Sequence, residues 1–202
     1  MIRIYHVNRT RSLRAIWMAE EMGLAYEAVA VPFPAARDVE YLKINPLGTL
    51  PAMVDGDVKI FESVAIIDYL ARRYGPTPLA LEPGQPGFGD YLQFLHMGEA
   101  TLSAPLTYLL HARFFGPESA KDEWTLGDIR KTFADRLRLV SGRLQSAPYM
   151  AGDQFTAADI SVGYALFMGR AIKAAESYDE RVTDYLDRLL ARAACPAAMK
   201  AA

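Results

Sequence analysis

A stretch rich in proline and glycine divides this sequence into two parts with different patterns. Residues 75–89, GPTPLALEPGQPGFG, hold four prolines and four glycines, a composition typical of a linker. Short apolar runs alternate with helical patterns before this stretch, whereas only long helical patterns follow from Asp90 onward. We therefore expect two domains: a mixed α/β domain first and an all-helical domain second.

The part before the linker has the pattern of a small mixed sheet. A strand, a helix and a second strand open the chain, and such a unit favours two parallel strands with a right-handed connection. The turn signal Asp55-Gly56-Asp57 then predicts an antiparallel hairpin, which leads into a helix with Ser63 as the expected N-cap. The predicted elements are a strand at 1–7, a helix at 11–24 with Gly23 as its stop, a strand at 25–33, a short helix or turn at 37–46, a hairpin at 50–62 and a helix at 63–75.

The part after the linker has helical patterns and no convincing strand. Thr156 and Asp159 stand three residues apart at the start of one apolar run, so we expect a capping box that satisfies two backbone N–H groups. The helical patterns cover residues 91–115, 125–145, 156–175 and 181–195.

The charge balance and the cysteine content exclude several classes of function. Lys and Arg number 22 against 24 Asp and Glu, so the chain lacks the basic surplus of a general nucleic-acid binder. Cys195 is the single cysteine, which excludes an intramolecular disulfide and a cysteine-based zinc site, and we expect it to be structural. No apolar run reaches the roughly 18 residues of a membrane span, and no signal peptide is expected. These features predict a soluble cytoplasmic protein with no metal and with no nucleic-acid or membrane partner.

Pro51 opens the first strand of the predicted hairpin. Proline cannot donate a hydrogen bond to a neighbouring strand, so it belongs at a strand start or on an edge. After the Gly48-Thr49 turn, the Leu50–Pro51 bond is a candidate for the cis form, although the local sequence alone favours an ordinary trans proline at a strand start.

Several motifs, taken in their order and spacing, resemble the glutathione transferase superfamily. They are NPLGTLPAM at 45–53, FES followed by AIIDYLARRYG within 61–75, GDQFTAADI at 152–160, and NRTRSLRAIWMAEEMGL at 8–24 with FLHMGEATLSAPL at 94–106, the last two being similar to a bacterial and fungal subgroup. The resemblance covers nearly the whole chain and implies the glutathione transferase fold. That fold comprises a thioredoxin-like glutathione-binding domain at 1–78, a linker at 79–88 and an all-helical substrate-pocket domain at 89–202.

The resemblance implies that one segment of the first domain binds glutathione as a cosubstrate. Leu50, between Thr49 and Pro51, offers its backbone N–H and C=O to the cysteinyl part of the tripeptide, which adds to the sheet edge as a strand does. Glu62 pairs with the γ-glutamyl ammonium, and Ser63, at a helix N-terminus, takes the carboxylate. Without the resemblance, Ser63 is a plain N-cap and Glu62 is a surface charge at a strand end.

The group that ionises the glutathione thiol is expected between the first strand and the first helix. A free thiol has a pKa of roughly 8.5, and a hydroxyl donor at the start of a helix lowers it. Thr10 is the first choice because it stands four residues before Arg14, where serine-type members of the superfamily place their hydroxyl. The alternatives are Ser12, which is otherwise a helix N-cap, Tyr5, which is otherwise an ordinary sheet aromatic, and Asn8, which donates through its amide.

Three arginines, Arg9, Arg11 and Arg14, crowd the same helix start. They form either a solvated basic face or a positive field that gathers glutathione and steadies its thiolate, and Arg11 is the one best placed to take part directly.

The resemblance implies a glutathione transferase that conjugates the thiolate to a small hydrophobic electrophile, and it implies a homodimer. Threonine in place of the usual serine or cysteine leaves a second interpretation open, a non-catalytic protein of this fold that binds ligands or serves in assembly. The electrophile is expected between the domains. Some of the following residues should wall its pocket: His96, Glu99, Leu102, Leu106, Leu110 and Phe114.

Overall fold

The structure is a computed structural model that describes residues 1–35, 38–121, 123–174 and 178–201. The chain forms two compact units, the first made of Met1–Ala80 with Leu190–Ala202 and the second of Leu81–Leu189. A mixed α/β unit therefore precedes a helical one, as the linker predicts. The first unit runs to Ala80, and it also includes the last residues of the chain, which the sequence assigned to the helical domain.

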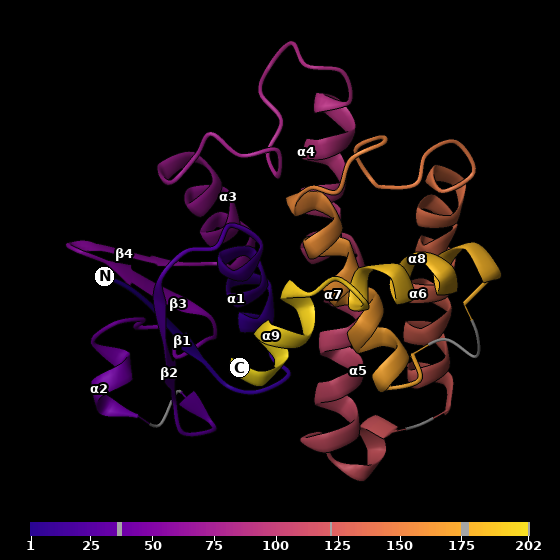
Figure 1. The fold of residues 1–202 in the computed structure, drawn as a ribbon. Coiled ribbons are helices and arrows are strands. Elements are labelled where there is room, and N and C mark those ends of the chain that lie inside the picture. Colours follow the sequence, from indigo (N-terminus) through magenta and orange to yellow (C-terminus); the bar gives the residue numbers. More distant parts are fainter. Residues whose placement is uncertain (36–37, 122, 175–177, 202) are drawn as a thin grey trace. The chain divides into compact units, whose positions relative to one another are not determined.

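The first unit is built around a four-stranded mixed sheet. Its elements are β1 (Ile2–His6), α1 (Ser12–Glu21), β2 (Tyr26–Ala30), α2 (Val39–Leu42), β3 (Ala52–Asp55), β4 (Val58–Phe61), α3 (Ser63–Arg73) and α9 (Ala194–Ala201) (Figure 1). The strand order is β2-β1-β3-β4, with β1 parallel to β2 and antiparallel to β3, and with β3 antiparallel to β4. The predicted parallel pair and hairpin are both confirmed. Arg37, the first residue of the predicted short helix, lies outside the described residues.

Helices cover both faces of this sheet. Side chains alternate between the faces along β1. Ile4 is buried on the face against which α1 packs, and Tyr5 points to the opposite face. On that opposite face the Tyr5 ring lies 5.7 Å from the ring of Tyr41 in α2, centroid to centroid. The end of β1 therefore leads out of a sheet that is packed on both sides.

The last helix of the chain, α9, packs against α1 in the same unit. The Arg192 guanidinium forms two hydrogen bonds of 2.7 Å to the Glu21 carboxylate at the end of α1, and Trp17 Nε1 donates to the same carboxylate at 3.0 Å. Cys195 is buried, and burial raises the pKa of its thiol to about 12, which fits the structural role predicted for it. These contacts explain why the C-terminal residues cluster with the sheet.

The structure places two N-caps one residue earlier than the sequence offered them, that of α3, expected at Ser63, and that of α1, for which Ser12 was an alternative. Arg11 is the N-cap of α1 and Glu62 is the N-cap of α3, so Ser12 and Ser63 are the first residues inside their helices. The reason is that both serine hydroxyls make other hydrogen bonds, described below. The predicted stop of α1 is confirmed: Gly23 has a φ of +62°, and its N–H donates to the Glu20 carbonyl at 3.1 Å.

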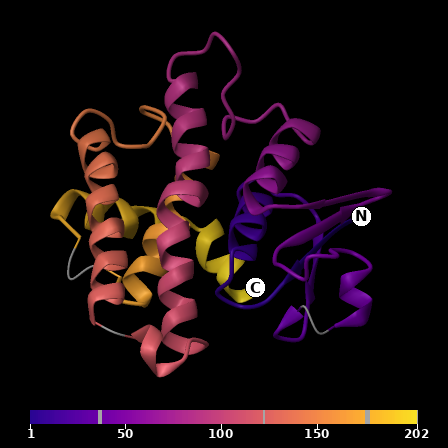
Figure 2. The same ribbon diagram turned by 180° about the vertical axis from the view of Figure 1, so that it is seen from behind.

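All the regular elements in the described residues of the second unit are helical, and one isolated bridge joins Tyr149 and Gly152. Its elements are α4 (Phe88–Met97), the π-helical segment η2 (Gly98–Ser103), α5 (Ala104–Phe114), the short 3-10 segment η3 (Glu118–Lys121), α6 (Glu123–Arg143), α7 (Ala157–Ala171) and α8 (Glu180–Leu190). Segments α4, η2 and α5 form one continuous rod, which Figure 2 shows from behind. None of the helices in the described residues has both the length and the apolar character needed to cross a membrane.

The π-helical segment lies just before Pro105. Proline has no backbone N–H, so the carbonyl of Thr101, four residues earlier, cannot receive its usual helical hydrogen bond. Arg136 of α6 fills this place: its Nη1 donates to the Thr101 carbonyl at 2.6 Å. The irregular turn is thus satisfied from a neighbouring helix.

The capping box at the start of α7 is confirmed, and Asp159 does more than the spacing predicts. Its carboxylate accepts hydrogen bonds from the Thr156 N–H at 2.8 Å, the Met150 N–H at 2.8 Å and the Tyr185 hydroxyl at 2.7 Å. Asp159 is fully buried, so desolvation raises its pKa against the effect of these donors. One carboxylate therefore joins α7, the loop before it and α8.

Candidate functional site

The strand register brings the predicted site residues to one end of the sheet. Ala52 pairs with Tyr5 of β1 on one side and with Phe61 of β4 on the other. Pro51, the residue before Ala52, therefore lies beside the exit of β1 and beside Glu62, which follows Phe61. The loop after β1, the residues before β3 and the residues after β4 therefore meet at this end of the sheet, which we call the β3 end.

The loop from β1 to α1 is organised by the carbonyl group of Val7. This oxygen lies 3.2 Å from the Thr10 N–H nitrogen, 2.7 Å from Thr10 Oγ1 and 3.2 Å from Ser12 Oγ. The two hydroxyl oxygens are themselves 2.7 Å apart. The two hydroxyl groups make three contacts: one between their oxygens, and one from each to the Val7 carbonyl. Because they have only two protons, one of these three contacts is not a hydrogen bond at any given moment.

Thr10 and Ser12 differ in exposure. Ser12 has 0% of its surface exposed, whereas Thr10 is half-buried. A ligand atom can approach the Thr10 hydroxyl but not that of Ser12. Of the two hydroxyls, the geometry favours Thr10 for contact with a ligand and leaves Ser12 to support it from behind.

The other two alternatives for the thiol-activating group lie apart from this hydroxyl pair. The Tyr5 ring packs with Tyr41 and beside Ala52 on the α2 face of the sheet, the place of an ordinary sheet aromatic. Asn8 is exposed in the turn after β1, and its amide has no hydrogen-bond partner among the described residues. Nothing in the packing holds Asn8 toward a ligand.

Leu50 and its neighbours present open backbone at the β3 end. The Leu50–Pro51 peptide bond is cis, which is the form the resemblance implies. Asn45 Nδ2 fixes the preceding residue by donating to the Thr49 carbonyl at 2.8 Å and to its hydroxyl at 3.0 Å. Within the described parts of the chain, neither the N–H nor the C=O of Leu50 has a hydrogen-bond partner. Both groups are available to an added extended peptide.

Glu62 and Ser63 stand at the start of α3 with opposite exposures. Glu62 is exposed and has a φ of +78° with a ψ of 111°, a conformation that side-chain-bearing residues rarely adopt. Ser63 is 2% exposed, and its Oγ accepts a hydrogen bond of 3.1 Å from Nη1 of Arg14. The first helical hydrogen bond runs from the Ile66 N–H to the Glu62 carbonyl, so the earlier N–H groups of α3 are open to an anion.

The three arginines do not act as one basic face. Arg9 is exposed with a φ of +60°, Arg11 is half-buried, and Arg14 is 0% exposed. Sequence reasoning grouped Arg14 with Arg9 and Arg11, as a solvated basic face or as a positive field for glutathione, and so missed its contact with Ser63. The run of buried residues from Ser12 to Ala19 in α1 gave no periodic signal that would have exposed this position as internal.

The residues expected to wall an electrophile pocket have different environments. Leu102 and Leu106 are buried, whereas His96 and Phe114 are exposed. Glu99 and Leu110 are intermediate. Their part in binding a second substrate stays a prediction.

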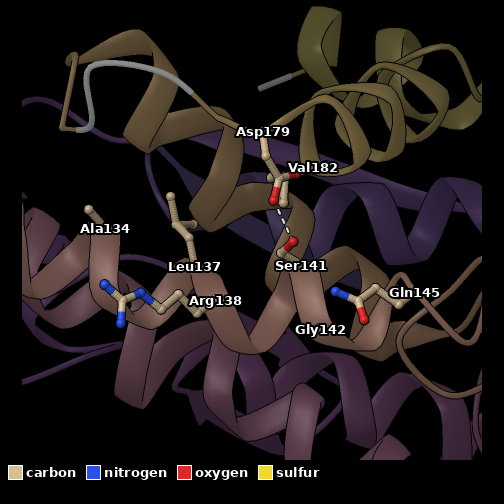
Figure 3. Close-up of a pocket in the computed structure, with 8 residues that line it drawn as sticks. All are labelled: Ala134, Leu137, Arg138, Ser141, Gly142, Gln145, Asp179 and Val182. Atoms are coloured by element: carbon tan, nitrogen blue, oxygen red, sulfur yellow. Dashed lines mark hydrogen bonds between the residues drawn. The ribbon is translucent and has the colours of Figure 1, made fainter.

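A cavity of about 370 Å³ in the helical unit has a structural explanation. It lies between α6 and the start of α8, and Figure 3 shows the Ser141 hydroxyl directed at the Asp179 carboxylate. The other oxygen of Asp179 accepts the Val182 N–H at 2.9 Å, so Asp179 caps α8 and ties it to α6. Within the described residues, no group of three His, Cys, Asp or Glu side chains is arranged to hold a metal ion.

Comparison with known proteins identifies the family. Residues 2–72 match the family described as the glutathione S-transferase N-terminal domain. Glutathione S-transferase 3 of Schizosaccharomyces pombe is 31% identical over 180 residues, which are 83% of this chain and 74% of that protein. The chain belongs to the glutathione S-transferase family. Glutathione S-transferase F10 of Arabidopsis thaliana is a further family member with 30% identity over 204 residues, 96% of this chain and 94% of its own.

A solved structure of a glutathione S-transferase confirms the predicted fold. Glutathione transferase URE2P6 from Phanerochaete chrysosporium, solved with oxidised glutathione, matches 98% of this chain and 94% of its own with a TM-score of 0.87 at 22% identity. The thioredoxin-like first domain and the helical second domain of the transferase fold are therefore both present here.

Proposed function

We propose that this chain is an enzyme that conjugates the thiolate of glutathione to small hydrophobic electrophiles. The observation that carries the proposal is the Glu62–Ser63 pair at the start of α3. An exposed carboxylate there stands next to a buried hydroxyl and open helical N–H groups. These groups are complementary to an ammonium and a carboxylate on one carbon, the γ-glutamyl end of glutathione. The oxidised glutathione in the URE2P6 structure supports the same ligand class.

Each end of the tripeptide has its own partner in this proposal. Glu62 pairs with the ammonium, and the Ser63 hydroxyl and N–H take the carboxylate. The open N–H and C=O of Leu50, next to Thr49 and Pro51, bind the cysteinyl backbone as an added strand. Arg11, half-buried at the N-cap of α1, adds positive potential near the sulfur.

The chemical step belongs to the glutathione sulfur, and the protein lowers its pKa and positions it. The Thr10 hydroxyl turns from the Val7 carbonyl and donates to the thiolate, while Ser12 keeps Thr10 in place. The thiolate attacks the electrophilic carbon of an aryl halide, a sulfur–carbon bond forms, and the halide leaves with the electrons of the broken bond.

The test combines binding and turnover. Calorimetry is expected to show glutathione binding to the wild type, and a generic aryl halide is expected to be conjugated in a glutathione-dependent reaction. Glu62→Ala should weaken binding by roughly 10- to 100-fold, because a hydrogen bond to a charged group is lost. Glu27→Gln, at an exposed carboxylate in the middle of β2, is the matched control and should change neither quantity. Absence of glutathione binding by the wild type would refute the proposal.

The hydrogen bond from Thr10 to the Val7 carbonyl favours a second candidate function, a ligand-binding protein without catalysis. At 2.7 Å, this bond keeps the only accessible hydroxyl of the loop turned away from a ligand. Tight glutathione binding without conjugation of any electrophile in a broad panel would support this second candidate over the first.

The proposal includes the partners that the resemblance implies. The protein works as a homodimer in the cytoplasm, with glutathione and a small electrophile as its ligands. Sedimentation at micromolar concentration is expected to give twice the mass of the 22.4 kDa chain.

A further inference from the structure

A buried hydrogen bond links the starts of the two helices that carry the site. Arg14, in the first turn of α1, donates from Nη1 to Ser63 Oγ, in the first turn of α3, at 3.1 Å. The two residues are 49 positions apart, and 0% of Arg14 and 2% of Ser63 is exposed. Neither the glutathione contacts nor the thiol chemistry proposed above assigns a role to Arg14.

The chemistry of this pair fixes the direction of the Ser63 hydroxyl. A guanidinium group has donors only, so Ser63 Oγ must accept from Arg14, and the hydroxyl proton must point elsewhere. The Ser63 side chain makes no other hydrogen bond with the described residues. A nearly buried donor is therefore left without a protein acceptor, beside the open N–H groups of α3.

We propose that Arg14 is a positioning residue. By donating to Ser63 Oγ, it directs the Ser63 hydroxyl proton away from the protein and toward a ligand, and so favours a carboxylate at the start of α3. This inference rests on the proposed function, in which that carboxylate belongs to the γ-glutamyl residue of glutathione. Arg14 does not touch the ligand. It fills one of the two lone pairs of the Ser63 oxygen on the protein side, and the proton of Ser63 then has only the ligand as its acceptor.

Two variants separate this role from simple packing. Arg14→Lys keeps a side chain that only donates, whereas Arg14→Gln introduces an amide whose oxygen also accepts, so the Ser63 proton can turn inward. Ser63→Ala gives the preference for the γ-glutamyl carboxylate that is expected when the hydroxyl donor is missing. The ligands are glutathione and, as the matched probe, γ-aminobutyryl-cysteinylglycine, which lacks only the γ-glutamyl carboxylate and keeps the ammonium group.

The readout is the ratio of the dissociation constants of the matched probe and glutathione, measured by calorimetry on each variant. Arg14→Lys should keep this ratio within about threefold of the wild type, and Arg14→Gln should lower it by about tenfold, toward the ratio of Ser63→Ala. A structural role alone would weaken both ligands equally and leave the ratio unchanged. An unchanged ratio in Arg14→Gln, or a ratio in Arg14→Lys as low as in Ser63→Ala, overturns the inference.

The outcomes also distinguish this inference from the proposed function. If the wild type fails to bind glutathione, the proposed function fails, and the role of Arg14 fails with it. If the wild type binds and Ser63→Ala lowers the ratio while Arg14→Gln does not, only the inference fails. Should thermal unfolding show that Arg14→Gln is not folded, Arg14→His takes its place, because a neutral imidazole ring can also accept the Ser63 proton: a ratio near that of Ser63→Ala supports the inference, and one near the wild type overturns it.

Discussion

Thr10 and Ser12 differ in how closely a ligand can approach them, and this difference gives the first prediction. Thr10→Ala is expected to lower kcat/KM at pH 6.5 by roughly 10- to 100-fold, because a thiol pKa that rises by about one to two units leaves that much less thiolate. Thr10→Ser keeps the donor and should retain most of the activity. The measurement is steady-state conjugation of an aryl halide at saturating glutathione.

Ser12→Ala is the matched control for the hydroxyl pair. Because Ser12 is fully buried, its loss should reduce kcat/KM by less than about fivefold, the cost of a weakened neutral hydrogen bond. If Ser12→Ala were as damaging as Thr10→Ala, or if Thr10→Ala were fully active, Thr10 would not be the activating group.

The backbone of Glu62 gives a second prediction at this scale. Its φ of +78° costs a residue with a side chain about 1–3 kcal/mol, a cost that glycine avoids. Glu62→Gly and Glu62→Ala both lack the carboxylate and should bind glutathione equally weakly. Denaturant unfolding should nevertheless find Glu62→Gly the more stable of the two, by about 1 kcal/mol. Equal stabilities would mean that no strain is stored at Glu62.

At the scale of elements, α7 depends on one buried carboxylate. Asp159→Ala removes the acceptor of four hydrogen bonds and leaves their buried donors unpaired. A loss of about 3 kcal/mol or more in the free energy of unfolding is expected, measured by urea denaturation. Tyr185→Phe removes only one of these donors and should cost about 1 kcal/mol. A variant Asp159→Ala with unchanged stability and yield would contradict this view of α7.

Local sequence rules predicted the elements whose determinants lie close together in the chain. The stop at Gly23, the turn at Gly56 and the capping box at Thr156 each depend on residues within three or four positions. The N-cap predicted at Ser63 was wrong, and Ser12 does not take its alternative role as an N-cap, because both hydroxyls bind other groups in the folded chain. No local pattern could show that Ser63 faces an arginine 49 positions earlier.

The rod of α4, η2 and α5 illustrates the same limit. The helical pattern of residues 91–115 predicted one continuous helix, without the π-helical segment that the structure shows before Pro105. The hydrogen bond that the Thr101 carbonyl accepts from Arg136 comes from a neighbouring helix, α6. Such a compensation follows from tertiary packing and cannot be read from the segment itself.

At the scale of the whole molecule, the division into two units was predictable and the path of the chain end was not. Proline and glycine at 75–89 marked the change from mixed to helical structure. The return of the last residues to the sheet depends on the packing of α9 on α1 and on the Arg192–Glu21 ion pair, which joins positions 171 apart. A helical pattern contains no information about such a partner.

The candidate site could be predicted as far as the resemblance identified its segments. Leu50, Pro51, Glu62 and Ser63 were chosen from motifs, and the strand register then explains why they meet: Ala52 pairs with both Tyr5 and Phe61. The choice between Thr10 and Ser12 needed side-chain exposure, a property of the folded chain. The role of Arg14 needed a single observed contact.

The central claim is that the β3 end binds glutathione and ionises its sulfur, and one titration tests it most directly. The ultraviolet absorbance of the thiolate is followed against pH for glutathione bound to the wild-type protein and for free glutathione. We predict that the bound thiol titrates about one to two units below the free value of roughly 8.5. A bound thiol that titrates at the same pH as free glutathione would contradict the claim.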